Sequence, residues 1–133
     1  MARLYHVPLS PFCRKVRLVL AEKKIDVELV EERYWEADPD FMRRNPAGKV
    51  PVLIVDGAVI TDSTAILQFL ADRHGAFTYP AGTIERAKQD SLTQFLLDEF
   101  DANLWMAARH SFVLPPELRQ PTIKQSLIWE FER

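Results

Sequence analysis

The sequence is poor in cysteine, in net charge and in long hydrophobic runs. One cysteine in 133 residues cannot form an internal disulfide, which favours a reducing cytoplasm as the location. Seventeen basic against nineteen acidic residues leave a net charge of -2, too little for a broad cationic surface. No apolar run approaches the roughly 20 residues that span a membrane, and the N-terminus has no secretory leader pattern. We therefore expect neither nucleic acid nor a membrane as a partner.

The composition instead indicates a globular chain. Hydrophobic residues make up 47% of the sequence and charged residues 27%, which is typical of a folded domain. The length fits one ordinary domain, or one small domain plus part of another. We predict an α/β domain over residues 1–76, a linker over 77–83 and helices over 84–133.

The first residues predict a strand, a loop and a helix. The run 3–7 has strand character, and "PLSP" then breaks it. Ser10 followed by Pro11 is typical of a helix start, because serine caps free amides and proline suits the first helical position. Apolar residues at helical spacing predict the inward face: Phe12, Val16, Val19 and Leu20.

The following segments complete an α/β module with a mixed sheet. We expect a strand (26–32), a loop with a short helix (34–48), two strands (50–55 and 58–60) and a helix (61–75). Asp56 and Gly57 predict a tight hairpin between the two later strands. The last helix is expected to end at Gly75 and to bury Ala65, Ile66, Phe69 and Leu70.

The remaining residues predict helices only. One long helix is expected from Ile84 to about Arg109, a break at 111–121, and another helix from Thr122. Each carries an apolar stripe that must pack against something else. We therefore expect that the chain is truncated, or that it finds these packing partners elsewhere.

The segment "SPFCRKVR", residues 10–17, is the first that could carry chemistry. Ser10 has two interpretations: a plain helix cap, or a hydroxyl that donates to a thiolate supplied by a ligand at the positive end of the helix. Cys13 is interpreted as a small buried residue, or as a residual thiol that forms mixed disulfides.

Two further segments allow both a structural and a functional interpretation. "NPAGKVPVL" places Pro51 at a strand entry, where it is an ordinary trans proline or a cis turn that exposes the Val50 backbone to an extended peptide. "TDSTAI" places Asp62 and Ser63 at a helix start, as caps or as a site for a carboxylate.

Together, in this order, the segments "SPFCRKVR", "NPAGKVPVL" and "DSTAILQFL" resemble the amino-terminal, thioredoxin-like domain of the cytosolic glutathione transferase family. The resemblance covers residues 3 to about 75. The helical run after the linker resembles the start of that family's all-α second domain. The resemblance implies a serine-type, bacterial member of this family.

The resemblance also implies roles for individual residues. Ser10 aligns with the catalytic serine that hydrogen-bonds the glutathione sulfur, and Val50 would pair its backbone with the cysteinyl part of glutathione ahead of a cis Pro51. Asp62, where the family commonly has glutamate, and Ser63 would bind the γ-glutamyl end.

The resemblance further implies that Lys49 would reach the glycyl carboxylate of glutathione. A pocket for an apolar co-substrate is a further interpretation, and the aromatic residues that could wall it are Phe12, Phe100 and Trp105. The histidines His6, His74 and His110 lack metal-ligand spacing, so we expect no metal.

Three functions follow as hypotheses. The first is a glutathione transferase that activates the thiol of glutathione, its co-substrate, for attack on a small electrophile, with a homodimer implied by the resemblance. The second is a glutathione-dependent thiol-disulfide oxidoreductase that uses Cys13 or bound glutathione. The third is a non-enzymatic binding or regulatory module, because one fold serves several functions.

Overall fold

The computed structural model describes residues 1–75 and 77–132 and divides the chain into two compact units, Met1–Pro80 and Ala81–Arg133. The division falls inside the segment 77–83, and the domain bounds expected from the sequence stay a prediction. Among the helices of the described residues, none is long and apolar enough to cross a membrane.

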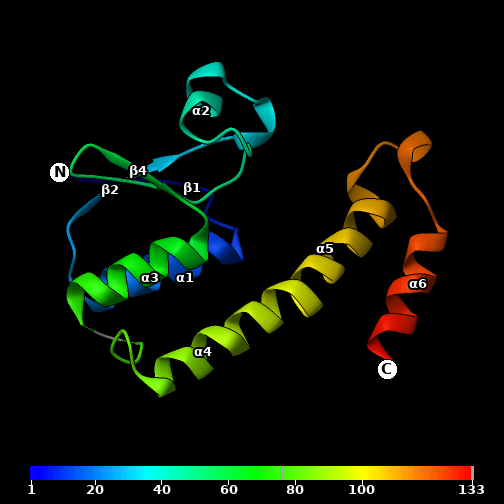
Figure 1. Ribbon diagram of the computed structural model, residues 1–133. Helices are drawn as coiled ribbons and strands as arrows, with labels where there is room; N and C mark the ends of the chain where they lie inside the picture. The colour runs from blue at the N-terminus through cyan, green and yellow to red at the C-terminus, as the bar shows by residue number, and fades with distance from the viewer. Residues whose placement is uncertain (76, 133) are drawn as a thin grey trace. The chain divides into compact units, whose positions relative to one another are not determined.

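The first unit is built on a four-stranded mixed sheet in the order β2-β1-β3-β4 (Figure 1). Its strands are β1 (Ala2–His6), β2 (Val27–Glu31), β3 (Val52–Val55) and β4 (Ala58–Thr61). β1 pairs with β2 in parallel and with β3 antiparallel, and β3 pairs with β4 antiparallel. A parallel pair needs a crossover, and helix α1 (Pro11–Glu22) provides it. This is the thioredoxin-like arrangement that the resemblance implies.

Strand alternation gives the sheet two buried faces. Leu4 and Leu53 face the side covered by α1 and by α3 (Ser63–His74), where they form one core cluster with apolar residues of both helices. The neighbouring residues Tyr5 and Val52 belong to a second cluster with Phe41 of α2 (Pro39–Arg44). Figure 1 shows α1 and α3 below the sheet and α2 above it. The short helical turn η1 (Tyr34–Glu36) precedes α2.

The helix boundaries and the hairpin agree with the sequence. Ser10 caps α1, and Gly75 ends α3 in the left-handed conformation with φ 64°. Asp56 and Gly57 connect β3 to β4 with φ 52° and 77°, the positive values that a tight type I′ turn requires.

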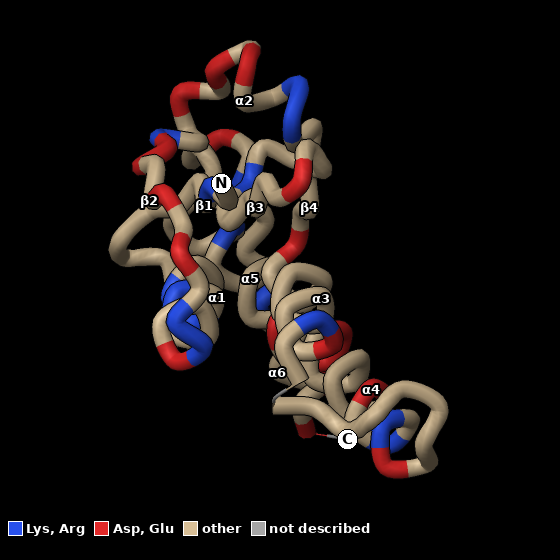
Figure 2. Tube along the Cα trace, turned by 90° about the vertical axis from the view of Figure 1, so that its left-hand side faces the viewer, with Lys and Arg blue, Asp and Glu red and all other residues tan. Residues whose placement is uncertain are grey.

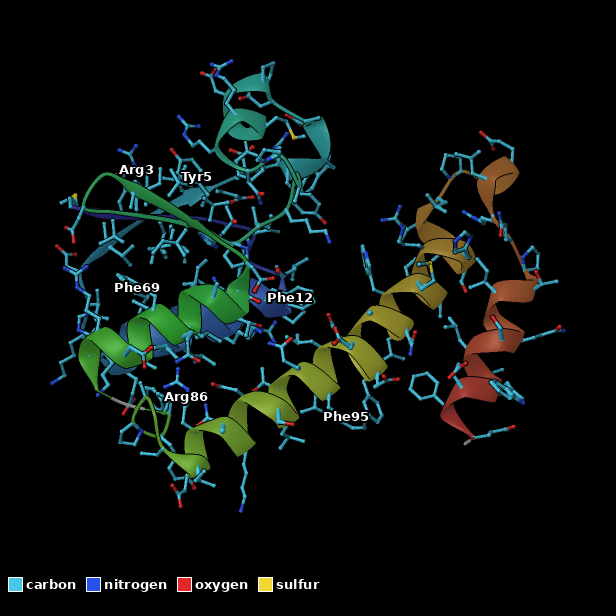
Figure 3. All side chains as sticks on the ribbon, viewed as in Figure 1. Arg3, Tyr5, Phe12, Phe69, Arg86 and Phe95 are labelled. Atoms are coloured by element: carbon cyan, nitrogen blue, oxygen red, sulfur yellow. The ribbon has the colours of Figure 1, made fainter. Side chains whose placement is uncertain are left out.

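Two residues expected on inward faces are instead exposed. Phe12 is 37% exposed, and the buried residues of α1 are Cys13, Val16 and Leu20. In α3, Ala65 is exposed, whereas Ala71 is buried. Phe69 is only partly buried and packs between α3 and the sheet (Figure 3). In both helices apolar residues cover more than one face, and the position of the sheet decides which face is buried.

The second unit is entirely helical. It contains α4 (Ile84–Phe95), a π-helical segment η2 (Leu96–Asp101), α5 (Ala102–Ala108), a second π-helical segment η3 (Arg109–Val113), a short turn η4 (Pro116–Leu118) and α6 (Thr122–Phe131). The predicted break at 111–121 is therefore too early, since the helix continues to Val113. Phe100 contacts Phe95 and Phe131, with ring centroids 5.7 and 5.6 Å apart, and so connects η2 with α4 and α6.

Candidate functional site

The three sequence motifs converge on one end of the sheet. β1 ends there at His6, β3 begins there at Val52, and β4 ends there at Thr61. The register fixes this, because Tyr5 pairs with Val52 and Val52 pairs with Thr61. The segments that leave the sheet at this end are 7–10, 50–51 and 62–63, which contain the candidate residues.

Ser10 is fixed by three backbone and side-chain hydrogen bonds. Its amide donates to the Val7 carbonyl at 3.1 Å, which closes a tight turn with Pro8 at the favoured second position. Its carbonyl accepts from the Arg14 amide at 2.9 Å, and its hydroxyl oxygen accepts from the Cys13 amide at 3.2 Å. Because the oxygen accepts, the hydroxyl hydrogen can be donated to a ligand.

Arg17 supports the same turn, and sequence reasoning missed it. Its Nη2 donates to the Pro8 carbonyl at 2.9 Å. Its Nε is buried and, among the described residues, has no hydrogen-bond partner. The only sequence signal was its place in α1, seven residues after Ser10 and therefore two turns along the helix.

The loop before β3 contains the cis peptide bond Val50–Pro51 that the resemblance implies. The side chain of Asn45, only 5% exposed, organises this loop: Nδ2 donates to the Lys49 carbonyl at 2.7 Å and Oδ1 accepts from the Ala47 amide at 3.2 Å. Sequence reasoning missed Asn45, although an asparagine before proline is a turn signal. Val50 packs in the same core cluster as Cys13, so this loop and the first turn of α1 are neighbours.

Asp62 and Ser63 begin α3 as the sequence predicts. Asp62 has the positive φ of 71°, and its Oδ1 accepts from the amides of Thr64 and Ala65 at 2.8 and 3.2 Å. A carboxylate at this position also interacts favourably with the helix dipole. Ser63 is only 6% exposed, so it is buried at the start of α3.

The other candidate residues lie on the two units separately. Lys49 precedes Val50 in the loop, and Phe12 lies in the first turn of α1 with the Lys15 ammonium 5.7 Å from its ring centroid (Figure 3). Phe100 and Trp105 belong to the second unit, where they are 42% and 43% exposed. The co-substrate pocket that these aromatic residues would wall stays a prediction.

Two groups near the sheet end, the buried His6 and the partly buried Glu32, have altered proton affinity. Burial, followed by the nearby Arg17 charge, lowers the pKa of His6 below its ordinary value. Burial and the Asp38 carboxylate raise the pKa of Glu32, whose amide donates to the His6 carbonyl at 2.9 Å. Within residues 1–75 and 77–132, no group of three His, Cys, Asp or Glu side chains could hold a metal ion.

Known proteins match this chain in sequence and in structure. FtsZ-localized protein A of Caulobacter vibrioides is 36% identical over 106 residues, which is 74% of this chain and 45% of that protein. A glutathione transferase homolog of Lodderomyces elongisporus, solved with two GSH per subunit, matches with TM-score 0.80 and 27% identity over 99% of this chain and 65% of that one. A GSH-bound glutathione S-transferase of Methylobacillus flagellatus matches with TM-score 0.69 and 30% identity over 100% and 66%.

The chain spans about half the length of the curated relative and about two thirds of the two solved structures. The family described as glutathione S-transferase, N-terminal domain, matches residues 4–78. This range contains β1 from Leu4 onward, the other three strands, α1, α2 and α3, and therefore the sheet end with its three motifs. The chain belongs to the glutathione S-transferase family.

Proposed function

We propose that this chain is a glutathione transferase that binds glutathione at the sheet end of its first unit. The observation that carries the proposal is the convergence of segments 7–10, 50–51 and 62–63 at that end. The bound GSH in related structures supports the same ligand here. The serine-type assignment is part of the proposal.

Each part of glutathione is assigned a partner by this proposal. The Val50 backbone, ahead of the cis Pro51, pairs with the cysteinyl residue as an extended segment can. Ser63 and Asp62 bind the γ-glutamyl end at the start of α3, where backbone amides and the helix dipole favour its carboxylate. Lys49 pairs with the glycyl carboxylate.

In the proposed reaction Ser10 donates its hydroxyl hydrogen to the glutathione sulfur. This hydrogen bond lowers the pKa of the thiol, and the thiol proton leaves to solvent. The thiolate then forms a bond to an electrophilic carbon, whose leaving group departs with the electron pair of the broken bond. Phe12, Phe100 and Trp105 are proposed to contact this apolar co-substrate.

Calorimetric titration with glutathione tests the binding site. We expect Lys49→Met to weaken glutathione binding by about fivefold, because an exposed ion pair contributes up to about 1 kcal/mol. Lys24→Met is the matched control, since Lys24 lies at the opposite end of the sheet, before β2. An unmeasurable heat of binding for the unaltered chain would refute the proposal.

A second candidate function is binding to the FtsZ filament. The match to FtsZ-localized protein A favours it, because the similarity extends over 106 residues and so beyond the first unit. Co-sedimentation of the purified chain with polymerised FtsZ tests this function. Pelleting that depends on FtsZ would support it, and a chain that stays in the supernatant at micromolar FtsZ would reject it.

The form of the oxidoreductase alternative that uses Cys13 is disfavoured by the burial of that sulfur. Cys13 is 0% exposed and packs beside Val50 and Tyr5. A thiol in that position cannot be attacked until the helix opens. The expected homodimer also stays a proposal, and light scattering of the purified chain measures it directly.

A further inference from the structure

We infer that Arg17 is a positioning residue for the reaction: by bonding the Pro8 carbonyl it fixes the turn that carries the Ser10 hydroxyl. The inference rests on the proposed function, since it assigns Arg17 a role only through Ser10. It gives a role to a residue of the first motif to which the sequence analysis assigned none.

The turn has backbone hydrogen bonds at its two ends, and between them the Pro8 carbonyl accepts from the Arg17 side chain. The Ser10 amide closes the turn on Val7, and the Ser10 carbonyl begins the hydrogen bonding of α1. The Pro8 carbonyl points outside this ladder, and proline has no amide of its own to contribute. Among the hydrogen bonds of the described residues, the one from Arg17 joins the Pro8–Leu9 segment to α1 in addition to those of Ser10.

Arg17 suits this task because of its own surroundings. Its Nε is buried, and its charge acts on the buried imidazole of His6, the residue that precedes the turn at the end of β1. The guanidinium therefore lies near both His6 and the turn, and its planar group presents several donors in fixed directions. A lysine at this position would keep the charge but lose that fixed geometry.

The effect on chemistry follows from the distances that hydrogen bonds tolerate. A donor that moves by about 1 Å loses much of its interaction with a charged acceptor, and misplacements of that size cost up to about a hundredfold in rate. Arg17 is two helical turns from Ser10, so its removal loosens the turn without removing the hydroxyl. We expect a partial loss of thiol activation.

Ultraviolet titration of the thiolate of bound glutathione tests the inference in the full chain. Arg17→Met should lower the thiolate fraction at neutral pH about three- to tenfold, less than Ser10→Ala, because a hydrogen bond to a charged group is weakened and not removed. Affinity for S-methylglutathione, which has no thiol to activate, should stay within about twofold. Arg17→Lys, which keeps a donor and the charge, should fall between Arg17→Met and the unaltered chain.

The matched control is Arg14→Met, which removes the same charge from the same helix. Figure 2 shows that α1 carries several Lys and Arg residues, and Arg14 is exposed. We expect its thiolate fraction to equal that of the unaltered chain. An equal drop in Arg14→Met and Arg17→Met, or an unaltered thiolate fraction in both Arg17 variants, would overturn the positioning role. Failure of Ser10→Ala to change the fraction would instead overturn the proposed function.

Discussion

Replacing Ser10 by aspartate separates the two interpretations of this residue. The Ser10 hydroxyl oxygen accepts from the Cys13 amide at 3.2 Å, so any variant that loses the oxygen also loses a helix cap. Ser10→Ala should cost about 1 kcal/mol of unfolding free energy for that reason. Aspartate caps helices as well as serine does, and its charge suits the helix start. The unfolding free energy of Ser10→Asp should therefore lie within about 0.5 kcal/mol of that of the unaltered chain.

The same two variants should rank differently in their effect on the pKa of the bound glutathione thiol. A hydrogen bond to a charged group contributes about 1.5–3 kcal/mol, and 1.36 kcal/mol corresponds to one pKa unit. Ser10→Ala should thus raise the pKa of bound glutathione by about 1–2 units. Ser10→Asp should raise it further, because a carboxylate beside the sulfur repels the thiolate.

Urea unfolding measures the contribution of Ser10 as a helix cap, and ultraviolet titration measures its effect on the pKa of the bound thiol. Ser10→Thr is the positive control, since threonine keeps both the capping oxygen and the hydroxyl hydrogen. The reasoning would be refuted if Ser10→Asp kept the thiol pKa of the unaltered chain while remaining folded. In that case Ser10 would act as a cap alone.

Three further predictions concern the scaffold around the site. Ile66→Ala, at a fully buried position of α3, should lose about 2–5 kcal/mol in urea unfolding, whereas Leu18→Ala at a 64% exposed position should lose under 1 kcal/mol. The pKa of His6 is lowered in the folded state, so as pH falls the unfolded chain binds a proton at His6 before the folded chain does. The unfolding free energy should therefore decrease as pH drops below about 6.5. His6→Gln should flatten this slope, measured as unfolding free energy against pH. Asn45→Asp keeps the acceptor for the Ala47 amide but loses the donor to the Lys49 carbonyl. It should therefore lower the unfolding free energy by about 1–3 kcal/mol and weaken glutathione binding in calorimetry. Unaltered stability would contradict the role of Asn45 in this loop.

The sequence predicted the elements of the first unit because each has a local physical cause. Asp56 and Gly57 adopt the positive φ values that their hairpin requires, and Ser10 caps the helix that Pro11 begins. The burial of α1 was predicted correctly for Val16 and Leu20 and wrongly for Phe12, because apolar residues occupy several of its faces. Only packing against Leu4 and Leu53 of the sheet selects Val16 and Leu20, and that packing is a property of the tertiary fold.

The end of the long helix shows the same limit in the second unit. The serine at 111 and the two prolines that follow indicated a break, but Ser111 bonds its hydroxyl back to the Ala107 carbonyl at 2.7 Å and stays helical. The backbone turns extended only at Leu114, the residue before Pro115, where the proline ring disfavours helix. The proline, and not the serine, therefore marks the end of this helix.

The candidate site was predicted in part because its motif residues also have structural tasks. Ser10 and Asp62 accept hydrogen bonds from amides in the first turns of α1 and α3. Such caps are recognised in a sequence as serine or aspartate at a helix start. The signals of Arg17 and Asn45 did not indicate their partners, because each donates to a carbonyl whose position depends on the path of a loop.

The same overlap of tasks determines which residues can report on function. A chain of this fold that had lost glutathione binding would still gain stability from a serine at position 10 and an aspartate at position 62, because both cap helices. Their presence therefore distinguishes a transferase from a binding module only weakly. Lys49 is different: its carbonyl accepts from Asn45, but in the described part of the chain no hydrogen bond of its ammonium group contributes to the fold. An effect of Lys49→Met on ligand binding, without an effect on unfolding, is thus the more direct evidence of a working site.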